Sequence, residues 1–280
     1  MTTNDTIGTL LRQGAQRLAP ISESPRLDAE LLLAQALGVG RSWLLTHAED
    51  TATPLTYRDW IERRAAGEPL AYIVGFKDFW TLRLAVTAAV LVPRPETELL
   101  VERALARVDR PTARIVDLGT GSGAIALALA AERPQWQVTA TDSSAPALAV
   151  ARANALALGL THVELLHGSW FAPLAGRHFD TIVSNPPYIA ADDPALAHPA
   201  LRREPQAALT PGGDGMAALQ TLIETAPRHL TRHGWLLLEH GAGQADEVTR
   251  RLVARGFHHV TSRRDLAGHE RVTEAQWPFD

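Results

Sequence analysis

A short polar turn in the sequence has the residue types needed to hold a flat, uncharged nitrogen group. Asn185, Pro186, Pro187 and Tyr188 follow an apolar run that ends at Ser184. An amide or aromatic NH₂ group offers two N–H donors, and the turn offers the Asn185 side-chain oxygen and the Pro186 carbonyl as acceptors. Proline adds no competing N–H, and a tyrosine ring can cover a flat group. An ordinary loop is the alternative, because Asn-Pro and Pro-Pro are common loop dipeptides.

A glycine-rich segment lies where a predicted strand becomes a predicted helix. Its glycines allow a tight turn that brings backbone N–H groups close to a ligand, and a helix N-terminus favours a carboxylate or phosphate. The spacing also fits the permissive dinucleotide-binding pattern, and a plain strand-to-helix turn is the simpler alternative. The candidate cofactor-binding residues here are Gly119, Thr120, Gly121, Ser122 and Gly123.

An acidic residue, Asp142, directly follows the next predicted strand. An acidic side chain roughly 20 residues beyond such a glycine loop accepts hydrogen bonds from both hydroxyls of a ribose. The alternative is a helix N-cap, for which Ser143 and Ser144 serve equally well. NAD and S-adenosylmethionine both carry a ribose, so these residues indicate a nucleoside without identifying it.

The segments that position these residues alternate between strand and helix. Because ligands bind at the carboxyl ends of the strands in such folds, the alternation brings the candidate residues together. It predicts a parallel, doubly wound sheet with helices on both faces. The final runs, 257–261 and 272–277, have no helix between them and are expected to close the sheet antiparallel. The predicted strands span 114–118, 138–141, 163–166, 181–184 and 235–239, and the predicted helices span 124–131, 146–158 and 248–254.

The front of the chain has a different pattern. Apolar residues at three- and four-residue intervals predict helices over 7–18, 27–37 and 57–66. Runs of β-branched and aromatic residues at 72–74 and 79–92 suggest a hairpin. We therefore expect a helical substrate-docking domain at 1–70, a β-hairpin linker at 71–95 and a domain at 96–280 that carries the site.

Composition excludes several classes of protein. The 280 residues are 46% hydrophobic and 21% charged, which is typical of a globular protein. There is no cysteine, and the histidines lack metal-ligand spacing, so we expect no metal site. A net charge of −4 disfavours nucleic acid as a partner. With no signal peptide or apolar run long enough for a membrane, we expect a cytoplasmic protein.

Nearly the whole chain resembles the PrmC/HemK family of protein-(glutamine-N5) methyltransferases. NPPY is shared with adenine-N6 DNA methyltransferases, but NPPY with PRPETE and a helical front domain is highly specific. The family implies a Rossmann-like, seven-stranded class I methyltransferase domain with a small N-terminal helical bundle. The matching segments are EPLAYIVG at 68–75, VLVPRPETE at 90–98, VDLGTGSGAIA at 116–126, DTIVSNPPYI at 180–189 and DLAGHERV at 265–272.

The resemblance implies S-adenosyl-L-methionine as cofactor and S-adenosyl-L-homocysteine as product. It places the cofactor on the Gly119 to Gly123 loop, with Asp142 on the ribose, Trp170 near the adenine and Asn185 beside it. It makes class 1 peptide chain release factors the partner, and the glutamine of their Gly-Gly-Gln motif the methyl acceptor. The catalytic residues are then Asn185, Pro186 and Tyr188, and the substrate-binding residues are Asn185, Pro186, Pro187 and Tyr188.

Other functions remain open from the residues alone. The first alternatives are a ribosomal-protein glutamine methyltransferase and an adenine-N6 DNA methyltransferase. From other classes come a nucleoside-binding oxidoreductase and a non-catalytic binding module, both of which leave NPPY without a role. Among further polar residues, we expect Glu96 and Thr97 to cap a helix rather than Arg94 and Glu96 to form a surface ion pair. Glu204 and Glu239 have equally good structural and functional interpretations.

Overall fold

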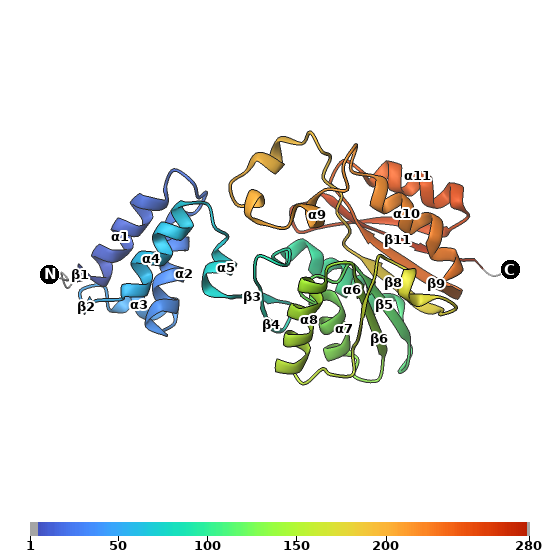
Figure 1. Ribbon diagram of the computed structural model, residues 1–280, viewed down its shortest axis with the longest axis horizontal. Helices are drawn as coiled ribbons and strands as arrows, with labels where there is room; N and C mark the ends of the chain where they lie inside the picture. Colours follow the sequence, from blue (N-terminus) through green and yellow to red (C-terminus); the bar gives the residue numbers. More distant parts are fainter. Residues whose placement is uncertain (1–4, 279–280) are drawn as a thin grey trace. The chain divides into compact units, whose positions relative to one another are not determined.

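The computed structural model describes residues 5–278 and divides into two compact units, whose elements are labelled in Figure 1. The first unit contains the chain up to Gly75 together with Ala197–Arg203. The second contains Phe76–Leu196 and the chain from Glu204 onward. Among residues 5–278, no helix combines the length and apolar character that crossing a bilayer requires.

The first unit is a small helical bundle. The Tyr57 hydroxyl joins two of its helices by donating to the Leu10 carbonyl at 3.1 Å. Gly14 makes room for this contact, because a Cβ there would lie 2.1 Å from the hydroxyl oxygen. All three predicted helices are present, while α3 and the pairing of β1 with β2 were not predicted. The elements are β1 (Asp5–Thr6), α1 (Ile7–Leu18), α2 (Pro25–Leu37), α3 (Arg41–Thr46), β2 (Thr51–Ala52), α4 (Leu55–Ala65) and α5 (Leu70–Val74).

Helix α5 corrects the expectation that 72–74 is extended. Pro69 precedes the helix and Gly75 ends it with φ 86°, so a proline and a left-handed glycine bound a single helical turn. Ala71 and Ile73 are buried, and Ile73 joins the core of the helical unit. Burial thus outweighs the preference of β-branched and aromatic residues for strands.

A segment remote in sequence completes the first unit. Residues Ala197–Arg203 cluster with the helices, and the Arg203 side chain donates to the Ala66 carbonyl at 3.2 Å. Gly67 approaches Pro199 so closely that a Cβ at Gly67 would lie 2.9 Å from the proline Cβ. Gly67 therefore serves two purposes, because its φ of 88° also ends the turn after α4.

The second unit is built on a seven-stranded sheet with the order β10-β11-β9-β8-β5-β6-β7. The five strands β5 to β9 are parallel, and β11 pairs antiparallel with both β9 and β10, as predicted. A separate hairpin covers β3 (Phe76–Phe79) and β4 (Leu82–Ala85), a narrower stretch than the predicted linker. The sheet strands are β5 (Arg114–Leu118), β6 (Gln137–Asp142), β7 (Glu164–His167), β8 (Phe179–Ser184), β9 (Leu230–Glu239), β10 (His258–Arg264) and β11 (Glu270–Gln276).

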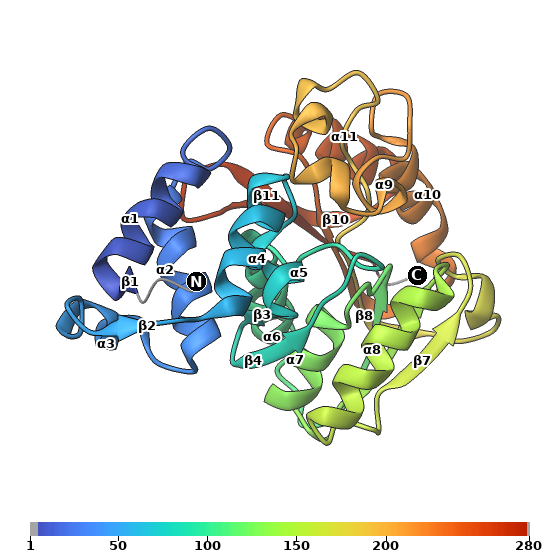
Figure 2. The ribbon, with the colours of Figure 1, turned by 60° about the vertical axis from the view of Figure 1, so that its left-hand side comes forward.

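Helices cover both faces of this sheet (Figure 2). Alternate residues of each strand point to opposite faces, so Ile115, Val183 and Leu237 join one core with α6, α7 and α8. Their neighbours Val116 and Ile182 join a second core with α10 and α11. The helices α9 and α10 were not predicted, and α6 was expected only as the helix that Glu96 and Thr97 would cap. The helices are α6 (Glu98–Arg107), α7 (Ala124–Glu132), α8 (Ala145–Ala157), α9 (Gln206–Leu209), α10 (Ala217–Thr225) and α11 (Ala245–Arg255).

One buried carboxylate, Glu274 on β11, joins three arginines. Its side chain is inaccessible to solvent and accepts from Arg103 at 3.1 Å, Arg107 at 2.5 Å and Arg263 at 2.8 Å. Burial opposes ionisation, yet the three arginines outweigh it and lower the pKa of Glu274 overall. The cluster ties α6 to the antiparallel edge of the sheet.

We predict that Glu274→Gln lowers the free energy of unfolding by about 3 kcal/mol at pH 7, because it leaves three arginines short of their carboxylate. Since the folded-state pKa is lowered, the stabilisation is present above the unfolded pKa and is lost as pH falls through the folded one. Urea denaturation at several pH values measures both effects. Glu247→Gln is the control, because its arginine pairs lie on the surface and should matter little. Equal midpoints for the two variants would contradict the role of Glu274.

Candidate active site

A cavity of about 200 Å³ opens at the carboxyl ends of β5, β6 and β8. It is lined by the predicted cofactor-binding residues Gly119, Gly121, Asp142, Trp170 and Asn185. Pro187 also lines it, whereas Thr120, Ser122, Gly123, Pro186 and Tyr188 do not. The remaining wall comes from Ala89, Val90, Leu91, Ser143, Ser144, Ala147, Ser169, Pro205, Ala207 and Ala208.

The glycine loop is fastened to the neighbouring strand. The N–H groups of Gly119 and Thr120 both donate to the Thr141 carbonyl, at 2.9 and 3.0 Å. Gly119 has a φ of 77°, and a Cβ there would lie 3.1 Å from the Trp170 ring. Gly121 has a φ of 56° and open space where its Cβ would be. The absence of side chains thus leaves the loop backbone exposed to the cavity.

Two polar side chains of the loop serve the fold itself. The Thr120 hydroxyl donates to Asp117 at 2.7 Å, and both Thr120 and Ser122 are buried. Burial raises the pKa of the Asp117 carboxyl to about 7, and its Oδ1 has no hydrogen-bond partner among residues 5–278. Neither Thr120 nor Ser122 lines the cavity.

Asp142 connects the second strand to the glycine loop. Its carboxylate accepts from the Gly121 N–H at 2.9 Å and from the Ser144 N–H at 2.8 Å. Ser144, not Asp142, caps α8 by accepting from the Ala147 N–H at 3.2 Å. Each carboxylate oxygen has a further lone pair, so a ribose diol fits the chemistry of this wall.

Trp170 forms another wall of the cavity. It has a φ of 48°, and its carbonyl accepts from the Thr141 hydroxyl at 3.0 Å. The next residue, Phe171, turns into the core and stacks on His229 with 4.7 Å between ring centroids. The strained backbone at Trp170 thus separates a cavity-lining aromatic from a core aromatic.

The Asn185 turn is held from two directions. The Ser184 hydroxyl donates to the Leu118 carbonyl at 2.6 Å, which joins this turn to the start of the glycine loop. The Asn185 NH₂ group donates to Thr97 Oγ1 at 3.0 Å, so its side-chain oxygen is left to accept from a ligand. The Pro186 carbonyl accepts no hydrogen bond from residues 5–278. The Asn185 oxygen is thus an acceptor at the cavity wall, whereas Pro186 is buried and does not line the cavity.

Tyr188 is more deeply engaged than the sequence suggested. Its hydroxyl donates to Glu239 Oε1 at 3.2 Å, and its carbonyl accepts from the Gln244 side chain at 3.0 Å. Burial and the adjacent carboxylate raise the pKa of the Tyr188 hydroxyl. The tyrosine therefore remains a neutral donor at the base of the turn.

The segment before α6 corrects the expectation that the Thr97 side chain caps this helix. Arg94 pairs with buried Glu204 at 2.5 Å rather than with Glu96. Glu204 also accepts from the Val92 N–H at 2.9 Å, so it holds the irregular segment whose residues 89–91 line the cavity. Thr97 stands at the N-terminus of α6 but makes no side-chain capping bond, because its hydroxyl is used by Asn185.

Glu239 is the residue whose importance the sequence left undecided. It ends β9, is 1% exposed, and has one oxygen without a partner among the described residues. Burial raises the pKa of its carboxyl to about 7. A carboxylate directly after an apolar run is the only signal in the sequence, and it gives no indication of burial.

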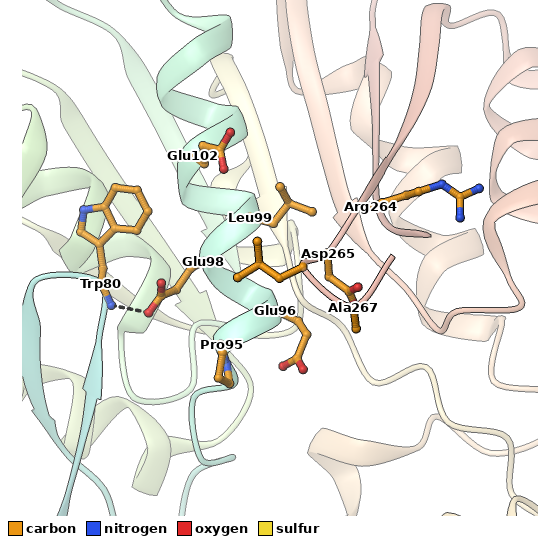
Figure 3. Close-up of a pocket in the computed structure, with 10 residues that line it drawn as sticks. Trp80, Pro95, Glu96, Glu98, Leu99, Glu102, Arg264, Asp265 and Ala267 are labelled. Carbon is orange, nitrogen blue, oxygen red and sulfur yellow. Dashed lines mark hydrogen bonds between the residues drawn. The ribbon is translucent and has the colours of Figure 1, made fainter. Parts of the chain in front are cut away.

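A second cavity, of about 340 Å³, lies beside the first turn of α6 (Figure 3). Trp80 and Leu99 contribute apolar surface, and Glu96, Glu98 and Asp265 contribute carboxylates. Glu98 accepts from the Trp80 N–H at 2.8 Å, as the dashed line shows. That bond anchors the start of α6, and with it Thr97, to the hairpin.

Solved structures share this architecture. The chain superimposes on the hMettl16 catalytic domain with a TM-score of 0.61 at 17% identity, covering 79% of this chain and 81% of that one. It superimposes on a methyltransferase from Pyrococcus furiosus with a TM-score of 0.53 at 19% identity, covering 70% of this chain and 89% of that one. Residues 95–216 match the model of a protein family described as "Methyltransferase small domain". These matches show the fold of class I methyltransferases.

Closer relatives narrow the class. Residues 9–75 match the PrmC N-terminal domain. A release factor glutamine methyltransferase from Pseudomonas aeruginosa is 50% identical over 97% of this chain and 99% of its own length. A release factor glutamine methyltransferase from Escherichia coli is 44% identical over 94% of this chain and 96% of its own length. The chain belongs to the family of release factor glutamine methyltransferases, which excludes the oxidoreductase and binding-module alternatives.

We predict that Gly119→Ala weakens S-adenosylmethionine binding at least about tenfold. The added methyl group meets the Trp170 ring and occupies a left-handed position, so the loop must move. Gly159→Ala is the matched control, with a φ of 70° and open space around it, remote from the cavity. Calorimetric titration should show nearly normal affinity for the control. Equal affinities in both variants would show that the loop does not form the cofactor site.

Proposed function

We propose that this protein transfers a methyl group from S-adenosylmethionine to the side-chain amide nitrogen of the Gly-Gly-Gln glutamine in class 1 release factors. The observation that carries the proposal is that one cavity contains both the nucleoside-type residues Gly119, Gly121 and Asp142 and the amide-type residue Asn185. The identity of the relatives over almost the whole chain supports the same substrate. Cofactor and acceptor would then meet at one edge of the sheet.

The cofactor's place follows from the walls of the cavity. Asp142 would hold the ribose, the backbone of the glycine loop would hold the amino-acid portion, and Trp170 would cover the adenine. When bound, S-adenosylmethionine supplies an electrophilic methyl group on a sulfonium centre.

The residues of the turn act by holding the nitrogen. The Asn185 side-chain oxygen and the Pro186 carbonyl would accept its two N–H bonds, and Pro187 and Leu91 contribute apolar surface to the cavity. As the nitrogen–carbon bond forms and the sulfur–carbon bond breaks, the nitrogen gains positive charge and both acceptors bind it more strongly. The remaining rate enhancement comes from positioning the nitrogen for in-line displacement. The nitrogen loses one of its protons after methyl transfer.

The helical region at 1–70 is proposed to dock the release factor. Its match to the PrmC N-terminal domain supports this role, since the cavity itself belongs to the other unit. A net charge of −4 argues against direct binding to nucleic acid. With a translation factor as substrate, the enzyme would act in the cytoplasm.

The test of the proposal is transfer of a radiolabelled methyl group to a purified release factor. We expect label on the wild-type factor and none on a variant in which the Gly-Gly-Gln glutamine is replaced by alanine. Tandem mass spectrometry then locates the methyl group on the glutamine. Equal labelling of the two factors would refute the substrate assignment.

We also predict that Asn185→Ala lowers kcat about 100-fold or more while the dissociation constant for S-adenosylmethionine changes little. The variant loses an acceptor that strengthens in the transition state, but the glycine loop and Asp142 are untouched. Single-turnover kinetics and calorimetric titration separate the two effects. An equal loss of binding and turnover would contradict the role assigned to Asn185.

A further inference from the structure

The Asn185 carboxamide can face a ligand in two ways, and only one suits a glutamine. Its oxygen accepts hydrogen bonds, whereas its NH₂ group donates them. If the NH₂ group faced the glutamine nitrogen, donors would meet donors. Whatever fixes the orientation of Asn185 therefore decides whether the site works, given the function proposed above.

The orientation is set first by Thr97. The Asn185 NH₂ group donates to Thr97 Oγ1 at 3.0 Å, and Thr97 is 4% exposed. A hydroxyl has a single hydrogen, so once its oxygen accepts from Asn185 that hydrogen is free to point elsewhere. The Thr97 hydroxyl lies near Glu239, at the end of β9, and lowers the pKa of its carboxyl.

Glu239 gives this chain of hydrogen bonds its direction. An ionised carboxylate only accepts, so both hydroxyls that face it must donate. Tyr188 does so at 3.2 Å, and the Thr97 hydroxyl is the other neighbour that favours the ionised form. A Thr97 hydroxyl that donates to Glu239 can only accept from Asn185, and this turns the Asn185 oxygen away from Thr97.

We propose that Glu239 and Thr97 are positioning residues for methyl transfer, which together hold the Asn185 carboxamide with its oxygen toward the glutamine nitrogen. Neither residue lines the cofactor cavity, so both act through Asn185. Thr97 is itself kept in place by its neighbour Glu98, which is bonded to the Trp80 backbone (Figure 3). The Trp80 indole in turn donates to Glu132 at 2.7 Å.

The charges around Glu239 make this orientation dependent on pH. Burial raises the pKa of its carboxyl to about 7, and Glu96 adds to the rise. The hydroxyls of Thr97 and Tyr188 and the charge of Arg271 on β11 act in the opposite direction. Above pH 7 the carboxylate enforces the order of donors. Below it, a neutral carboxyl can donate to Thr97, and the order is lost.

The test compares Thr97→Val, Thr97→Ser and Glu239→Gln with the wild type and with Asn185→Ala. Valine removes the hydroxyl while keeping the shape, and serine restores it. Glutamine keeps the shape of Glu239 but adds an N–H donor, which can reverse the direction of the hydrogen bonds from Glu239 to Asn185. For each variant we would measure kcat and KM with a release factor, the dissociation constant for S-adenosylmethionine, and kcat against pH.

We predict that Thr97→Val and Glu239→Gln lower kcat about 100-fold with little change in cofactor affinity, whereas Thr97→Ser stays within about threefold of the wild type. Wild-type kcat should rise as pH increases through about 7, and the residual activity of Glu239→Gln should not. Should Glu239→Gln fail to fold, the valine and serine variants decide the matter between them.

Two results would overturn the inference. The first is a near-normal kcat in Thr97→Val and Glu239→Gln together with a strongly reduced kcat in Asn185→Ala. It would refute the positioning roles and leave the proposed function intact. Equal losses in Thr97→Val and Thr97→Ser would show that shape, and not the hydroxyl, matters. Normal turnover by Asn185→Ala would refute the proposed amide site itself. This outcome differs from the two results above, which refute only the roles of Thr97 and Glu239.

Discussion

The parallel pairing of β5 with β6 and β8 is the constraint on which the site depends. Parallel strands end at the same edge, so the residues that follow each strand are brought together however far apart they lie in sequence. Gly119 follows β5, Asp142 ends β6 and Asn185 follows β8, and all three line one cavity. Hydrogen bonds between strand ends then fix the spacing, as Ser184 does by donating to Leu118.

Buried carboxyl groups recur at this edge. Asp117 ties down the glycine loop, and Glu239 lies beneath the Asn185 turn. Burial raises the pKa of both carboxyls to about 7 and removes the hydrogen bonds that water would otherwise provide. The hydroxyls of Thr120 and Tyr188 supply one such bond to each. The polar interior thus holds the loops that a cofactor and a substrate would contact.

Features that depend on local pattern could be predicted from the sequence. The strand and helix alternation gave the sheet, its antiparallel closure and the place of Gly119, Asp142 and Asn185. The prediction failed where the strand preference of individual residues and their burial disagree. Residues 72–74 were predicted to be extended but belong to α5, between Pro69 and Gly75.

Contacts between remote residues could not be predicted from patterns in one sequence. Thr97 and Asn185 are 88 residues apart, and Arg94 and Glu204 are 110 apart. Nothing near Thr97 indicates that its hydroxyl serves Asn185 rather than α6, and nothing near Ala197–Arg203 indicates that it joins the helical unit. Such pairings arise only once the sheet and its crossing loops are assembled.

The central claim is that the amide nitrogen of a glutamine meets the Asn185 oxygen beside the cofactor. A crystal structure of the protein with S-adenosylhomocysteine and a Gly-Gly-Gln peptide tests it most directly. We predict about 3 Å between the glutamine amide nitrogen and the Asn185 side-chain oxygen, with Thr97 still accepting from the Asn185 NH₂ group. A glutamine nitrogen held elsewhere in the cavity, with Asn185 turned away from it, would contradict the account.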